Sequence, residues 1–316
     1  MENKSTIQIQ QRIQKEFPDL YKKLDRLKGI TGFISILGSD PRVAVFCRYN
    51  HIRRVTGITS CLLELYPDRD PFKAIFLSLF HDINRLPFAH NLEKKIGFKQ
   101  DENLWDYFKN SKDEVPDDFI YDLESILQKK ILASPEAVLV YTADVVAGFI
   151  EDPILALSTL GLQKDSINAQ IMEILGFDSD VDAFYSQISH LNQLYNTDGA
   201  LFSTTLGEVA LQYAASFIER FSAKNKLLVE TDSFQEMRNK VKSGLLQNII
   251  FPVNNEKVSK GSRLASEIAI PYMAYLKSHG FDPIEKLLEM TDQEVLDQAV
   301  TLGLVPLNPK EYWPDL

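Results

Sequence analysis

Four Asp-Pro dipeptides divide this chain into segments that can each begin a helix. They stand at Asp40-Pro41, Asp70-Pro71, Asp152-Pro153 and Asp282-Pro283, each ahead of a run with apolar helical periodicity. An Asp side chain accepts hydrogen bonds from the unpaired N–H groups of a helix start, and Pro suits the first helical position. Each dipeptide therefore predicts a helix start. Two further starts are predicted at Ser134-Pro135 and at the capping-box pattern Thr291–Glu294.

The apolar residues between these breaks recur with helical spacing, which predicts an all-α fold. Strand signals are weak, and residues 250–258 could form a short hairpin or an extended loop. No repeat, low-complexity tract or long linker interrupts the chain, so residues 1–316 are expected to form a single domain. The expected helices span residues 6–28, 41–66, 71–84, 116–130, 134–151, 153–160, 178–197, 205–224, 232–248, 260–278, 283–289 and 292–302.

Composition limits the partners and the location that can be expected. The net charge of -10 argues against sequence-independent binding to nucleic acid or anionic membranes, because both need a basic surface. The apolar stretch at 74–80 is far shorter than the roughly 20 residues of a membrane span. Two cysteines make no disulfide framework, and the polar N-terminus has no signal-peptide pattern. We expect a cytoplasmic protein with no membrane partner and no stable nucleic-acid binding.

Histidine and aspartate residues mark the candidate site. Three of the five histidines, His51, His81 and His90, lie between positions 51 and 90, and Asp82 directly follows His81. Asp144 lies in an almost wholly apolar helix, where a buried unpaired charge is costly. Two imidazoles and two carboxylates without a thiolate favour Mn, Fe, Co, Ni or Mg over structural zinc. His51, His81, Asp82 and Asp144 are the predicted metal ligands, although each alone could be a hydrogen-bonded core residue.

The order of these ligands resembles the H…HD…D signature of the HD-domain metal-dependent phosphohydrolases. The segment from Arg48 to His51 resembles the R-x-x-H of the deoxynucleoside triphosphate triphosphohydrolases. HDINRLPFAHNLE, residues 81–93, resembles their HD-x-G-H-x-P-F-x-H-x-x-E segment. TADVVAGFIED, residues 142–152, resembles their A-D-x-I-x-Y-x-x-x-D-x-E-D helix, and fainter similarity continues to about residue 300.

The resemblance implies an HD-domain helical core at about residues 40–160, with additional C-terminal helices at about 161–316. It implies one divalent metal ion, a nucleotide substrate and a symmetric homo-oligomer. The implied reaction is attack of water at the α-phosphorus of a deoxynucleotide, which releases intact triphosphate. His90 and Glu93 would then handle protons, Arg48 would bind the substrate, and Asp152 would contact the sugar.

Other basic residues are weaker candidates for phosphate binding. Arg53, Lys257, Lys260 and Arg263 could neutralise phosphate charge, but a charge cluster such as that of Lys257, Lys260 and Arg263 is usually a solvated face. Asp152 has a sufficient alternative role as a helix cap before Pro153.

The chain departs from the family pattern at two positions. Arg85 stands where the family has a His, and Arg stays protonated, so it cannot act as a general base, although it can bind phosphate or stabilise developing charge. Arg85 could also be a solvated residue near a helix end. Gly148 stands where the family usually has a Tyr beside the sugar.

These departures keep two alternatives open. The first is a phosphatase or phosphodiesterase acting on a modified nucleotide in biosynthesis or defence. The second is a catalytically weakened, nucleotide-binding regulatory homologue.

Overall fold

The computed structural model describes residues 4–30, 47–128, 132–160, 181–222 and 265–309. Every regular element within these ranges is a helix, and none is a strand. The predicted all-α class is confirmed. The first half contains α1 (Lys4–Glu16), α2 (Pro18–Lys23), η1 (Leu24–Gly29), α3 (Arg48–Leu65), α4 (Pro71–Phe80), α5 (His90–Ile96), η3 (Asp101–Asn103), α6 (Leu104–Lys109) and α7 (Asp117–Gln128). The second half contains α8 (Pro135–Leu160), α10 (Val181–Thr197), α11 (Gly199–Ser222), the π-helix η7 (Ala265–Ala269), α14 (Ile270–Ser278), α15 (Pro283–Leu287) and α16 (Asp292–Thr301).

Helix starts predicted from capping residues are confirmed at four places. α8 begins at Pro135, and the Ser134 hydroxyl accepts from the backbone N–H of Ala137 at 3.1 Å. The Asp70 carboxylate accepts from two backbone N–H groups of α4, and Asp282 does the same for α15. Thr291 and Glu294 form both halves of the capping box of α16. Asp40-Pro41 lies outside the described residues, as do the helix expected at 232–248 and the hairpin or loop at 250–258.

The helix start predicted at Asp152 is wrong. α8 continues unbroken through Asp152 and Pro153, so the two helices expected on either side are one. A proline in a helix interior costs about 3 kcal/mol, because it removes one backbone hydrogen bond and crowds the preceding turn. Ile154 and Ser158, just beyond the proline, are fully buried, and α8 packs against α3, α4, α7, α10 and α11. This packing outweighs the local preference for a break.

Several other boundaries differ from the sequence prediction. Pro18 starts a new helix, so the segment expected as one helix at 6–28 becomes α1, α2 and η1. Cys47 is extended, and α3 begins at Arg48 rather than at 41. α4 ends at Phe80, which places His81 just beyond the helix. The short helices α5 and α6 were not predicted, because six or seven residues are too few to show a periodicity.

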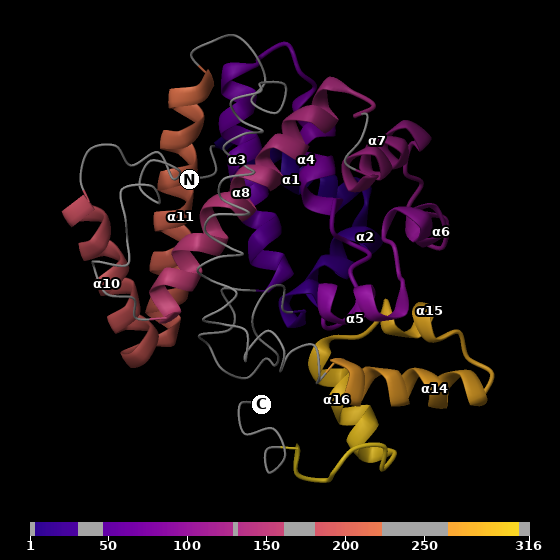
Figure 1. Cartoon of the computed structure of the whole chain (residues 1–316). Coiled ribbons are helices and arrows are strands. Elements are labelled where there is room, and N and C mark those ends of the chain that lie inside the picture. Colours follow the sequence, from indigo (N-terminus) through magenta and orange to yellow (C-terminus); the bar gives the residue numbers. More distant parts are fainter. Residues whose placement is uncertain (1–3, 31–46, 129–131, 161–180, 223–264, 310–316) are drawn as a thin grey trace.

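The main hydrophobic core surrounds α4, which is enclosed by α1, α3, α7 and α8 (Figure 1). Every residue of α4 from Ala74 to Phe80 is buried, as its uniformly apolar sequence requires. The Phe76 ring packs against Phe17, Phe80 and Phe119, with ring centroids 4.9, 4.6 and 5.0 Å away. α10 and α11 cover α8 from the other side, and α11 also contacts α3. The end of α4, where the candidate site begins, is therefore rigidly placed.

A second hydrophobic core joins the C-terminal helices to the segment that follows α4. η7, α14, α15 and α16 contribute most of its residues, and Leu86, Phe88 and Leu92 enter it from the first half of the chain. Figure 1 shows these yellow helices beside α5. No helix within the described ranges is both long enough and apolar enough to cross a membrane.

Candidate metal centre

His81, the first residue beyond α4, presents a buried nitrogen with an available lone pair. Its Nδ1 lies 2.8 Å from the carbonyl oxygen of Ser78, which can only accept, so Nδ1 carries the proton and donates it. The Nε2 of the neutral ring is therefore an acceptor, and this buried atom has no hydrogen-bond partner among the described residues. Burial lowers the pKa of His81 to about 4, which favours the neutral ring. An imidazole fixed in this way fits a metal ligand.

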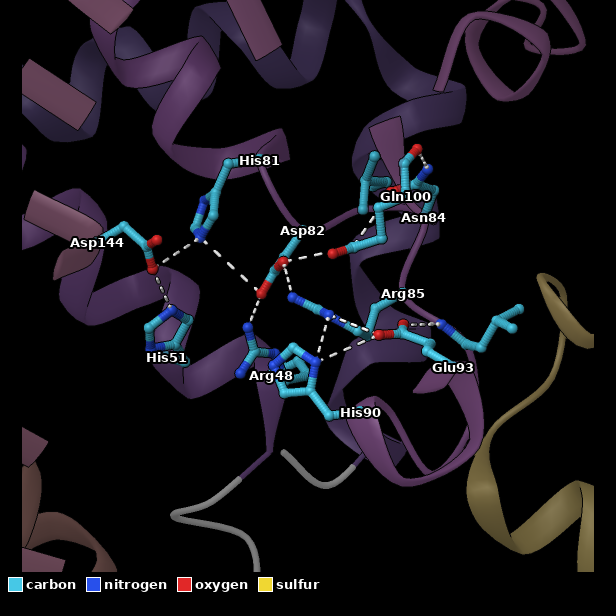
Figure 2. Close-up of polar contacts among 12 residues, drawn as sticks. Arg48, His51, His81, Asp82, Asn84, Arg85, His90, Glu93, Gln100 and Asp144 are labelled. Carbon is cyan, nitrogen blue, oxygen red and sulfur yellow. Dashed lines mark hydrogen bonds and ion pairs between the residues drawn. The ribbon is translucent and has the colours of Figure 1, made fainter. Parts of the chain in front are cut away.

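His51 from α3 and Asp144 from α8 lie beside the His81 ring (Figure 2). His51 Nε2 is 3.0 Å from Asp144 Oδ1, and His81 Nε2 is 3.7 Å from the same oxygen. The two imidazole centroids are 5.7 Å apart. The Asp144 side chain is 21% exposed, whereas that of His81 is only 2% exposed. Asp144 thus forms the solvent-facing edge of the cluster.

Asp82 supplies a buried carboxylate to the same cluster. Its Oδ2 lies 4.0 Å from His81 Nε2 and accepts a hydrogen bond from Arg48. Its Oδ1 accepts from Arg85 Nη2 at 2.5 Å. One potential ligand atom from each of His51, His81 and Asp82 lies within 4.8 Å of the other two. These three buried residues can therefore hold a metal ion.

Arg85 is buried and paired, so its alternative interpretation as a solvated residue is wrong. Its guanidinium lies between two buried carboxylates, with Nη2 donating to Asp82 and Nη1 donating to Glu93 Oε2 at 2.8 Å. The backbone N–H of Leu86 also donates to Glu93, at 3.2 Å. The positive charge of Arg85 is thus used to hold two carboxylates in place.

His90 and Glu93 form the outer part of this network. Burial opposes ionisation of Glu93, but the Arg85 charge and the His90 contact outweigh it and lower the pKa of Glu93 to about 2. The Arg85 charge also lowers the pKa of His90, against the opposing effect of its hydrogen bond to Glu93. His90 Nδ1 lies 3.3 Å from Arg85 Nη1 and 3.4 Å from Glu93 Oε2, and the His90 side chain is 68% exposed. A neutral ring can accept from Arg85, and a protonated ring can donate to Glu93.

The remaining predicted site residues are not brought into this cluster by the described structure. Lys257, Lys260 and Arg263 lie outside the described residues, and so does the side chain of Asp152. Arg53 lies on α3 with an exposed side chain. The other two histidines, His190 and His279, are exposed.

Two polar residues at the site were missed by sequence reasoning. Gln100 Nε2 donates to Asp82 Oδ1 at 3.4 Å and to Asn84 Oδ1 at 3.3 Å. Asn84 Nδ2 in turn donates to the Gln100 carbonyl oxygen at 2.8 Å (Figure 2). Asn84 lies within the motif segment and could have been considered, whereas Gln100 has no pattern around it that would single it out.

Comparisons with known proteins do not assign the chain to a family. A scan against protein-family models gave no match, and a search among curated proteins gave no match either. The likeness to HD-domain phosphohydrolases therefore depends on the motif residues, and the functional argument depends on the cluster that these residues form.

Proposed function

We propose that the protein is a metal-dependent phosphohydrolase that acts on a nucleotide, with deoxynucleoside triphosphate triphosphohydrolase activity as the first candidate. The observation that carries the proposal is the buried, unprotonated His81 Nε2, which lies beside His51, Asp82 and Asp144 with no hydrogen-bond donor among the described residues. A buried acceptor is rarely left unsatisfied. A cation is the partner that suits all of these groups.

The ligands available would be His51, His81, Asp82 and Asp144. This mixed nitrogen and oxygen set suits Mn, Fe, Co, Ni or Mg. Such an ion would supply Lewis acidity to a phosphoryl oxygen and would lower the pKa of water, which is the chemistry that phosphate-ester hydrolysis needs.

The formal charges around the site also suit an anionic substrate. Asp82, Asp144 and Glu93 contribute three negative charges, and Arg48 and Arg85 contribute two positive charges, which leaves -1 with neutral imidazoles. One divalent cation would change this sum to +1. The local charge can therefore attract phosphate although the whole chain carries -10.

The residues around the ligands have different tasks in this proposal. Arg48, whose side chain is 14% exposed, can reach a phosphate at the edge of the cluster. Arg85 is enclosed by carboxylates, so it orients Asp82 and Glu93 instead of contacting phosphate. His90 has a lowered pKa, which favours its neutral form, so its exposed ring can act as a base that takes a proton from water while the ionised Glu93 lies beside it.

A direct test uses purified protein, each of Mn, Co, Ni and Mg, and a panel of deoxy- and ribonucleoside triphosphates. We expect turnover that depends on the metal and disappears in His81→Ala and Asp82→Ala, with triphosphate and nucleoside as products. His190→Ala is the matched control, because His190 is exposed on α10. Absence of metal-dependent turnover in folded wild-type protein, with nucleotide binding retained, would favour the regulatory homologue.

A phosphatase or phosphodiesterase acting on a modified nucleotide is the second candidate. Gly148 lies one helical turn beyond Asp144 on α8, and a Cβ added there would meet no described atom within 4 Å. The position therefore leaves room where the family usually has a Tyr beside the sugar, and a group on a modified nucleotide could use this room. Release of orthophosphate, pyrophosphate or nucleoside monophosphate from the same panel would favour this candidate. Light scattering of the purified protein would test the homo-oligomer that the resemblance implies.

A further inference from the structure

The turn between Asp82 and α5 contains two consecutive residues in a conformation that side chains disfavour. Phe88 and Ala89 have φ angles of 60° and 41°, in the left-handed region where glycine is usual. Such a conformation persists only where the surrounding structure holds it, and it is enriched at functional sites. Something must therefore keep this turn in place.

The direction of the two side chains explains why the turn is needed. Phe88 is buried in the core of the C-terminal helices, whereas Ala89 is buried in the main core around α4. Neighbouring residues thus enter different cores, and α5 begins immediately afterwards with His90. The position of α5 relative to α4 depends on this turn.

Asp292 holds the turn from a distant part of the sequence. Its Oδ1 accepts the backbone N–H of Phe88 at 2.6 Å, and Asp292 is only 1% exposed. A carboxylate that accepts from a buried backbone N–H makes a strong, charge-assisted hydrogen bond. Asp292 is also the first residue of α16, so this bond connects the C-terminal core to the turn.

From the turn, a short series of hydrogen bonds leads to the metal centre. Leu86 N–H donates to Glu93 at 3.2 Å, Glu93 accepts from Arg85 at 2.8 Å, and Arg85 donates to Asp82 at 2.5 Å. Every one of these groups is buried. A shift of the turn would move Glu93 and, through Arg85, the carboxylate of Asp82.

Arg26 fastens the other side of the same segment. Its Nη2 donates to the carbonyl oxygens of Ile83 at 3.0 Å and Arg85 at 2.8 Å, and its Nη1 donates to the Met290 carbonyl at 3.1 Å. One guanidinium from η1 therefore connects the residues after His81-Asp82 to the loop that precedes α16.

We propose that Asp292 is a positioning residue for the metal centre, acting through the Phe88–Ala89 turn and the Glu93–Arg85–Asp82 series. The proposal rests on the proposed function in so far as this centre binds a metal. The C-terminal helices thereby take part in metal binding without contributing a ligand.

The test compares Asp292→Ala and Asp292→Asn by calorimetric titration of the full chain with Mn²⁺. Residues hydrogen-bonded directly to metal ligands affect metal affinity by about 10- to 100-fold, and Asp292 acts through one of them, so we expect a loss at the lower end, about tenfold, for Asp292→Ala. Asn keeps the accepting Oδ1, so Asp292→Asn should retain most of the affinity. Hydrogen exchange at the Phe88 amide should accelerate in Asp292→Ala only. Asp297→Ala is the matched control, because Asp297 is exposed on the same helix and accepts only from the Gln293 side chain among the hydrogen bonds found for its carboxylate.

A rescue variant separates positioning from general stability. Ala89→Gly removes the steric penalty at a positive φ, so it should recover part of the affinity lost in Asp292→Ala. If Asp292→Ala alone does not fold, the double variant Asp292→Ala/Ala89→Gly is compared with the single variant Ala89→Gly, and weaker Mn²⁺ binding by the double variant supports the proposal. The proposal is overturned if folded Asp292→Ala binds Mn²⁺ as tightly as the wild type, or if the double variant binds it as tightly as Ala89→Gly.

Metal titration also distinguishes this inference from the proposed function. A wild-type protein that binds Mn²⁺ but hydrolyses no nucleotide would contradict the function and leave the Asp292 comparison intact. A wild-type protein that hydrolyses nucleotides with unchanged metal affinity and KM in Asp292→Ala would contradict only the positioning role.

Discussion

The two halves of the candidate centre are built in different ways. His51, His81 and Asp144 come from α3, from the end of α4 and from α8, and the packing of these helices places them. Arg85 and Glu93 lie on and after a strained turn, and the ion pairs of Arg85 with Asp82 and with Glu93 hold them in place. Metal affinity should therefore depend most directly on the first half. Stability of the local structure should depend most on charge balance in the second half.

Removing the central charge of the second half should have the largest effect. Arg85→Met leaves Asp82 and Glu93 buried with one fewer cationic partner, and loss of one partner from a buried ion pair typically costs about 3–5 kcal/mol. We expect a decrease of this size in the free energy of unfolding, measured by urea denaturation. Arg85→Met/Glu93→Gln should recover part of it, since one carboxylate no longer needs a counter-charge. A double variant no more stable than Arg85→Met would show that the pair is not coupled.

Removing the candidate ligand nitrogen of His81 from the first half should strongly weaken metal binding. The free energy of unfolding should change less than in Arg85→Met. His81→Ala is expected to weaken Mn²⁺ binding by more than about 100-fold, beyond the range typical of residues outside the ligand set. Titration calorimetry on the folded variant measures the Mn²⁺ affinity directly. His190→Ala should bind as the wild type does. Retained affinity in His81→Ala would mean that the ion is held elsewhere.

The two halves should also respond to acid in different pH ranges. In chelator-treated protein, His81 has a folded pKa of about 4 against an ordinary 6.5, so the unfolded chain binds the additional proton first. Stability associated with neutral His81 should fall as the pH decreases from about 6.5 to 4. Glu93 has a folded pKa of about 2 against 4.5, so its contribution should be lost between about pH 4.5 and 2.

Urea denaturation at a series of pH values separates these ranges. His81→Gln should flatten the upper range, and Glu93→Gln should flatten the lower one. The same slope in both variants and the wild type would argue against the electrostatic difference between the two halves.

Capping residues should give the smallest effects. Asp70→Ala removes the cap of α4, and Asp282→Ala removes the equivalent cap of α15, so each should cost about 1 kcal/mol of stability. Neither residue contacts the candidate metal centre. Thermal denaturation should show the loss of stability, and calorimetric titration of the folded variants should show unchanged Mn²⁺ affinity. A large loss of affinity in Asp70→Ala would indicate that α4 is less firmly packed than its buried surface suggests.

Local sequence signals were sufficient to predict features that depend only on interactions within one helix. The caps at Asp70, Asp282 and Thr291 need only their own helix, so their positions could be predicted. The ligand set could be proposed because motif spacing brings His81 and Asp82 together in sequence. The gathering of His51 and Asp144 around them required the helices to pack.

Local sequence signals failed to predict features that depend on contacts between residues far apart in the sequence. Asp152-Pro153 has the pattern of a helix start, yet tertiary packing keeps α8 continuous through it. Asp292 and Arg26 lie far from the motifs, and nothing in their immediate sequence shows that they contact the same turn. Arg85 was expected near solvent or substrate, but only the fold reveals that carboxylates enclose it on two sides.

The hydrogen bond from His81 to the Ser78 carbonyl links the tautomer of His81 to the residue at which α4 ends. Ser78 belongs to the last turn of α4, where carbonyl groups lack a partner further along the helix. Its oxygen is therefore available to hold the proton on Nδ1. A sequence change that extended α4 by one turn would bring a helical N–H to the same carbonyl, which would then share its two lone pairs with the imidazole. The end point of the helix therefore favours the tautomer in which the nitrogen that faces the cluster carries no proton.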